Sequence, residues 1–127
     1  MGIRETWNSI EAVLVERGFP MIDADDVPQN RRSMIRVVEI QGENTLRGAF
    51  ASGRVRLSFV VEIVLFYDTT NDARIERRVA EDSEGVIAAI YADVNLTNHH
   101  FLGAVLERTP GVVRNVMRFA FQGEAAL

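Results

Sequence analysis

The sequence predicts an α+β fold, a two-layer sandwich in which two helices lie on one face of a mostly antiparallel sheet. The chain of 127 residues has the size of one domain, so residues 1–127 are expected to form a single α+β domain. Two segments repeat apolar residues every three or four positions, as amphipathic helices do, and four others have the composition or alternation of strands. Their order along the chain is α-β-β-α-β-β.

The first helix is predicted over residues 3–17. Gly18 suits the left-handed position that ends a helix, and Pro20 prevents continuation. The residues that follow, 23–32, are polar and contain Pro28, which indicates a loop. The apolar stripe of the helix consists of Ile3, Trp7, Ile10 and Leu14.

Two strands are expected after the loop. The first is predicted over residues 34–41. The second, over 54–67, is the clearest strand because its odd positions are all apolar. Its even positions begin polar and become apolar apart from Glu62, so the second half is expected to be covered on both faces, whereas the polar-faced first half is a candidate hairpin arm. Residues 43–53 fit either a loop or an irregular strand.

The second helix is predicted over residues 73–94, with Asn95 as its C-cap. Its charged residues lie opposite the apolar stripe, where Arg77 and Glu81 are spaced for an i,i+4 ion pair. The stripe consists of Ile75, Val79, Val86, Ile90 and Val94.

The last two strands are predicted over residues 99–108 and 112–122. Residues 109–111, Thr-Pro-Gly, have the composition of a turn between them. The tail, 123–127, is expected to be frayed.

The composition excludes several kinds of site. The chain has no cysteine, so disulfides, thiolate nucleophiles and cysteine zinc sites are impossible. The net charge of −4 disfavours general nucleic-acid binding. No segment approaches the ~20 apolar residues of a membrane span, and no signal peptide is recognisable, so a soluble, cytoplasmic protein is expected. All 14 basic residues are arginines, which fits a GC-rich genome or a protein rich in interface contacts.

No motif for nucleophilic catalysis, phosphate binding or dinucleotide binding occurs, so neither an enzymatic activity nor a cofactor is expected. His99 and His100 are adjacent on a predicted strand and would point to opposite faces, which disfavours chelation of one metal ion. The acidic cluster before Pro28 lacks the glycine and the final glutamate of an EF-hand loop, so a solvated loop is preferred to a weak cation site. This cluster consists of Asp23, Asp25 and Asp26.

Glu62 lies among apolar neighbours in the middle of a predicted strand. A buried carboxylate of this kind can act as an acid or a base. More often it is paired with an arginine or lies at a subunit interface, and we favour that interpretation.

Four arginines are the candidate interface or lumen residues. Arg54 and Arg56 share one face of their strand, and Arg114 and Arg118 share one face of the last strand. If these strands pair, the four could form one basic patch that faces DNA or an acidic partner. A solvated sheet face is the other interpretation.

Two stretches of the chain, together with the order of its elements, resemble the tail terminator proteins of long-tailed bacteriophages. In one stretch a long strand ends in Phe66-Tyr67-Asp68, a polar turn follows, and a charged helix opens over residues 74–84. The other is the start of the chain, where an amphipathic helix is followed by Gly18-Phe19-Pro20, an acidic loop and a strand. The resemblance covers most of the chain and rests on pattern, not on an invariant motif.

The resemblance implies a ring, usually a hexamer, that caps the tail tube, stops its polymerisation and joins tail to head. It implies contacts with the tail tube protein and a head-completion or connector protein, and a lumen through which DNA passes without sequence-specific binding. It also implies a place in the virion, at the neck end of the tail, after synthesis in the host cytoplasm, and neither enzyme activity nor cofactor. The alternative is a small dimeric ligand-binding or regulatory module of the same fold class, which would need a pocket with convergent polar groups.

Overall fold

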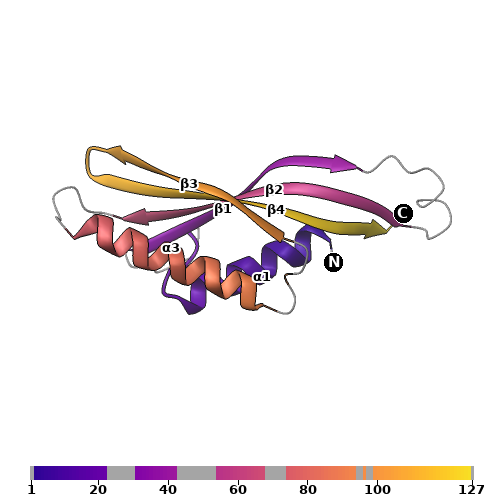
Figure 1. Ribbon diagram of the computed structural model, residues 1–127, viewed down its shortest axis with the longest axis horizontal. Helices are drawn as coiled ribbons and strands as arrows, with labels where there is room; N and C mark the ends of the chain where they lie inside the picture. Colours follow the sequence, from indigo (N-terminus) through magenta and orange to yellow (C-terminus); the bar gives the residue numbers. More distant parts are fainter. Residues whose placement is uncertain are drawn as a thin grey trace.

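The computed structural model describes residues 2–22, 31–42, 54–67, 74–93, 96 and 99–126, apart from the side chains at positions 31, 54, 125 and 126. The predicted α+β fold class is confirmed, and the elements follow the predicted order. Both helices lie on the same side of a long, curved sheet (Figure 1). The elements of the described part are α1 (Ile3–Glu16), β1 (Arg31–Gly42), β2 (Arg54–Tyr67), α3 (Ile75–Ala92), β3 (His99–Thr109) and β4 (Val112–Ala126).

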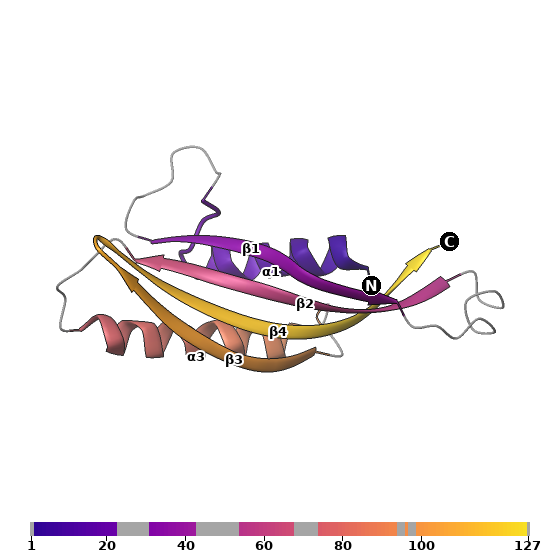
Figure 2. The same ribbon diagram turned by 90° about the horizontal axis from the view of Figure 1, so that it is seen from above.

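The described strands form one sheet in the order β1-β2-β4-β3, and every neighbouring pair is antiparallel (Figure 2). The central strands are β2 and β4, whereas β1 and β3 form the two edges. Each edge strand contains one bulge, at Val38 in β1 and at Leu102 in β3. The β3 bulge is followed by Gly103, whose φ of 134° favours a residue without a side chain.

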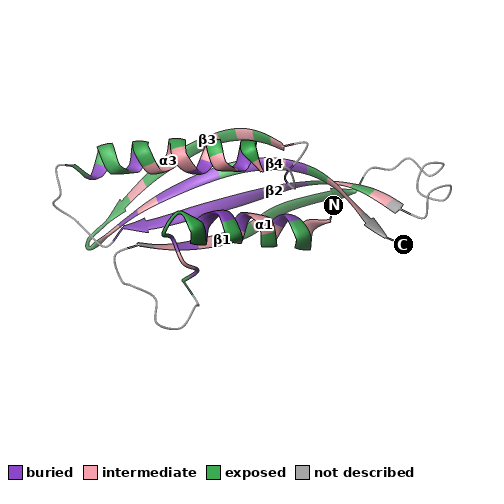
Figure 3. Cartoon of the chain, turned by 90° about the horizontal axis from the view of Figure 1, so that it is seen from below, coloured by how far each residue is buried: buried purple, intermediate pink, exposed green. Residues whose placement is uncertain are grey.

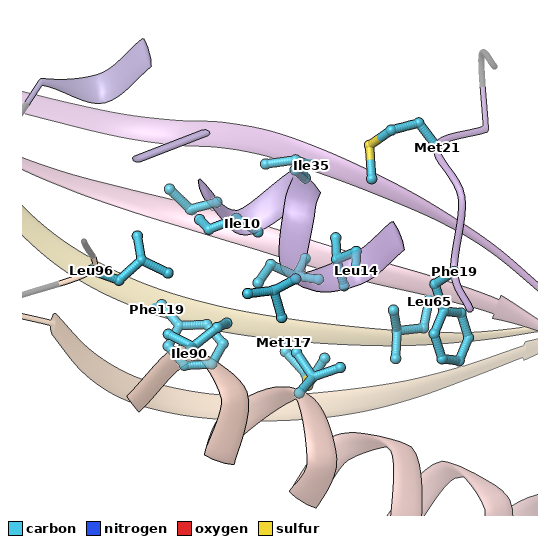
Figure 4. Close-up of a cluster of buried hydrophobic side chains, with 14 of the residues drawn as sticks. Ile10, Leu14, Phe19, Met21, Ile35, Leu65, Ile90, Leu96, Met117 and Phe119 are labelled. Atoms are coloured by element: carbon cyan, nitrogen blue, oxygen red, sulfur yellow. The ribbon is translucent and has the colours of Figure 1, made fainter. Parts of the chain in front are cut away.

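The main hydrophobic core lies between the helices and one face of the sheet, here called the covered face. Figure 3 shows the buried residues running along β2 and β4 behind the two helices. The stripes predicted for both helices contribute to it, as the close-up of Ile10, Leu14 and Ile90 against β2 and β4 shows (Figure 4). Its fully buried residues, with 0% exposure, include Ile10, Leu14, Ile63, Leu65, Val86, Ile90, Met117 and Phe119.

The end of α1 is fixed by a left-handed glycine and by contacts with β1. Gly18 has a φ of 85°, and the Phe19 amide donates a hydrogen bond to the Leu14 carbonyl at 2.8 Å, as the sequence predicts for a helix ending here. The chain then runs beside β1, where the Ser33 amide donates to the Pro20 carbonyl at 2.9 Å.

Three predicted boundaries were wrong. β1 begins at Arg31, inside the segment predicted as loop, because Pro20–Ile22 pairs with its first residues. The C-cap of α3 is Asp93, not Asn95. β4 continues to Ala126, where a frayed tail was expected, because the first residues of β2 extend the ladder to that point.

The pairing of β2 with β4 also determines what the polar-faced first half of β2 forms. It forms an arm together with the end of β4, and this arm extends past the start of α1 (Figure 1). Residues 43–53, whose conformation the sequence left open, lie outside the described residues, as do residues 23–30 and 94–95.

Candidate functional site

The second face of the sheet has no described helix against it and is here called the open face (Figure 2). Because strand residues alternate between faces, the even-numbered residues of β2 and β4 belong to it. Its chemistry changes along its length: the arm carries polar and charged side chains, the middle carries the Glu62–Arg118 ion pair, and the part towards the β3–β4 turn is mostly apolar apart from Arg114. On the two central strands it comprises Arg56, Ser58, Val60, Glu62, Val64 and Phe66, and Val112, Arg114, Val116, Arg118, Ala120, Gln122 and Glu124.

A charged row crosses the middle of the open face. Glu62 on β2 lies between Arg36 on β1 and Arg118 on β4, each directly opposite it in the ladder. One carboxylate oxygen accepts from Arg36 Nη2 and the other from Arg118 Nε, both at 2.8 Å. The Glu62 side chain is 9% exposed, whereas those of Arg36 and Arg118 are 45% and 56% exposed. The buried charge is therefore paired on both sides, which is the arrangement favoured for Glu62 from the sequence.

Beyond this row lies a small apolar cluster on the open face. It consists of Val64, Phe66 and Val116, with Met34 and Val112 packed against it. Val64, Phe66 and Val116 are buried although no described helix covers them, and side chains of the sheet contribute to their cover. The Arg32 guanidinium, for example, lies 5.8 Å from the centre of the Phe66 ring.

The four candidate arginines lie on one face, as predicted from strand pairing. β2 pairs with β4, and the ladder places Arg56, Arg114 and Arg118 on the open face; Arg54 joins it by its backbone position, while its side chain lies outside the described part.

They do not form a continuous basic patch within the described residues. Arg56 lies opposite Glu124, Arg118 binds Glu62, and Arg114 Nη2 binds Glu107 on β3. Arg56 and Arg118 are also about 20 Å apart along the ladder at the usual rise of a strand. The open face therefore alternates positive and negative charge.

Exposed apolar side chains gather on the two edge strands. Val38 and Ile40 on β1 are 44% and 58% exposed, and Val105 on β3 is 63% exposed. Leu102 and Leu106 on β3 are exposed as well. An edge strand presents unpaired backbone groups, so apolar side chains beside them are a common mark of association.

Each histidine occupies a different environment, which confirms that the two point to opposite faces. His99 packs against the rings of Tyr91, at 4.2 Å between ring centres, and Phe121 on the covered face, whereas His100 is exposed on the open face. Within the described residues no group of three or more His, Asp or Glu side chains could hold a metal ion. The acidic cluster at 23–26 lies outside them.

Sequence reasoning missed two polar pairs between α3 and the sheet. The Tyr67 hydroxyl donates to Asp82 Oδ2 at 2.7 Å. Asn115 Nδ2 donates to the Ser83 hydroxyl at 2.7 Å, and this hydroxyl donates to the Val79 carbonyl at 2.6 Å. The only signal in the sequence is that Tyr67 and Asn115 are polar groups at positions expected to face the core.

Described residues of the helix layer line two hollows that are open to solvent. One is lined by charged residues of the first turns of α3, and the other lies between the ends of α1 and α3. No helix among the described residues is long and apolar enough to cross a membrane. The sequence matches no model of a known protein family and no curated protein sequence.

Proposed function

We propose that this chain is the subunit of a tail terminator, a ring that caps a phage tail tube, stops its polymerisation and joins tail to head. The observation that carries the proposal is the pair of edge strands, β1 and β3, which lie at opposite sides of one sheet and expose apolar side chains. A ring needs two different, complementary surfaces on each subunit, and two distinct edges supply them. The resemblance in element order and in the segments around residues 18–20 and 66–84 supports the same conclusion.

The open face is our candidate for the surface that lines the lumen. Its arginines alternate with glutamates, so it carries little net charge per unit length. Strong, salt-dependent DNA binding depends on many unneutralised basic side chains. A neutralised face would let DNA pass without holding it, which suits a channel in the neck of a virion and requires neither enzyme activity nor cofactor.

The first test is the assembly state of the purified protein, measured by light scattering across a concentration series and by negative-stain imaging. The expected result is a closed ring of about six subunits. Added to polymerising tail tube protein, the ring should bind tube ends and halt their growth. A defined dimer with no effect on tubes would contradict the proposal and favour the small ligand-binding or regulatory module.

The arginines of the arm provide a second test. Replacing both Arg54 and Arg56 by Ser should leave the melting temperature nearly unchanged, since Arg56 is exposed. If these side chains contact a neck partner or DNA, the yield of completed particles should fall at least tenfold. Normal yield would remove them from the proposed interface without affecting the ring itself.

A further inference from the structure

The two edges of the sheet are matched in direction. Because the sheet has four strands and all neighbours are antiparallel, β1 and β3 run in opposite directions. When a second copy is placed beside β3 in the same orientation, its β1 continues the antiparallel pattern without any reversal. An odd number of strands would have required the less stable parallel pairing.

The backbone groups of the two edges are matched as well. On β1 the Ser33 amide points away from β2 and donates to the Pro20 carbonyl. In an antiparallel ladder every second residue directs its amide and carbonyl away from the neighbouring strand. The bulge at Val38 shifts this alternation by one residue, so beyond it Ile40 is the first residue whose backbone groups point outward. On β3 the Phe101 amide points outward to the Tyr91 hydroxyl, at 3.2 Å, and past the bulge the next outward residue is Ala104.

The side chains of Ile40 and Ala104 both lie on the covered face, because Ile40 is directly opposite Phe59 and Ala104 is directly opposite Met117, and both of these partners belong to the main core. Pairing the two edges through these outward groups therefore keeps the helices of both copies on one side. The open faces of the copies then join into one continuous surface.

Each edge is occupied over its first residues and accessible beyond them. Pro20–Ile22 hydrogen-bonds to the start of β1, and Tyr91 hydrogen-bonds to the start of β3. No backbone hydrogen bond from another described segment reaches the outer side of residues 34–42 or 104–109. Since β1 and β3 are antiparallel, these accessible stretches lie diagonally, near opposite ends of the sheet.

We propose that residues 34–40 of β1 pair with residues 104–109 of β3 in a second copy of this chain, head to tail, with Ile40 opposite Ala104. This inference deepens the proposed ring and rests on it. The register sets the large, exposed Ile40 side chain beside a small one. With the Val38 bulge retained, it also sets Arg36 opposite Glu107, so the charges on the open face continue to alternate across the interface.

The register also has the stagger that closes a sheet. Across the sheet, Ala104 is aligned with Met117 and Ile63, whereas Ile40 is aligned with Phe59. Pairing Ile40 with Ala104 therefore displaces each copy along the strand direction by four residues relative to the copy before it, and each copy contributes four strands. A shear equal to the number of strands gives a tilt of about 36°, as in eight-stranded barrels of shear eight. With the helices outside, the shift coils the strands in the right-handed sense that strand twist favours.

The absence of cysteine from the chain allows a direct test. The double variant Ile40→Cys/Ala104→Cys, mildly oxidised at concentrations where light scattering shows association, should give a ladder of covalent multimers on a non-reducing gel. A hydrogen-bonded antiparallel pair has Cα atoms about 5.5 Å apart, within reach of a disulfide. An equal mixture of the two single variants should give covalent dimers only, and each single variant alone should give none.

The control is Val15→Cys/Ala104→Cys, because Val15 is exposed on α1 and lies outside both of the strand segments proposed to pair. The pairing is overturned if the test variant cross-links no more than this control, if a single variant cross-links to itself, or if the protein stays monomeric at every concentration. Closed rings without the cross-link would overturn the pairing and leave the proposed function standing. A covalent ladder without closed rings would support the pairing and contradict the terminator ring.

Discussion

The two faces of this sheet are built from the same central strands but reach burial in different ways. On the covered face, Ile63 and Phe119 are sealed by a second layer of secondary structure. On the open face, Val64 and Phe66 are almost as inaccessible, yet no described helix lies over them, and the Arg32 guanidinium lies over the Phe66 ring. Equal exposure therefore does not mean equal packing.

The difference has an energetic consequence. A side chain enclosed by two rigid layers leaves a cavity when it is truncated, because the surroundings relax only partly. A side chain covered by long, flexible arginines leaves a space that these side chains can fill. The covered face should therefore set the stability of the fold, and the open face should tolerate change, as a surface available for interaction does.

The largest expected effect compares two phenylalanines. Phe119→Ala on the covered face should lower the free energy of unfolding by about 3–5 kcal/mol, because it empties the centre of the core. Phe66→Ala on the open face should cost about half as much. Urea denaturation followed by circular dichroism measures both, and equal losses would contradict the contrast between the two faces.

The next effect concerns the charged row. Glu62→Gln should cost about 1–3 kcal/mol, since it leaves two arginines without their carboxylate. Arg118→Gln alone should cost less, about 0.5–1 kcal/mol, because Arg36 still pairs with Glu62 and the lost partner is half exposed. The reverse order, measured in the same denaturation assay, would mean that the carboxylate is not the centre of the row.

A third comparison uses two serines. Ser83→Ala should lower stability by about 1–2 kcal/mol, because it leaves the buried Asn115 amide without its acceptor. Ser58→Ala on the exposed part of the open face should change stability by less than about 0.5 kcal/mol. A comparable loss in both variants would show that the hydrogen bond under α3 contributes little.

The fold was predictable because its local signals agree with one another. The alternation in β2, the stripes of both helices and the left-handed Gly18 each point to the element that forms. The missed boundaries depend instead on partners distant in sequence. β1 starts early because Pro20–Ile22 lies beside it, and β4 ends late because β2 does.

The candidate surface was predictable only in part, for the same reason. Alternation places Arg56, Arg114 and Arg118 on one face once β2 and β4 are paired. It cannot supply the register, which decides that each arginine meets a glutamate instead of another arginine. The contribution of Arg36 and Glu107 depends on strands whose position in the sheet no local pattern reveals.

The smallest expected effect is the only one that increases stability, and it is tested by comparing variants of the two adjacent histidines. Neither ring nitrogen of His99 has a hydrogen-bond partner within the described residues, although both are buried against the aromatic rings on the covered face. His99→Phe keeps a planar ring while removing those two polar atoms, so it should raise the free energy of unfolding by about 0.5–1 kcal/mol. His100→Phe, on the exposed side of the same strand, should leave it unchanged. A loss of stability in the His99 variant would mean that its nitrogens are satisfied by water in solution, and that the covered face is less completely closed at this edge than at its centre.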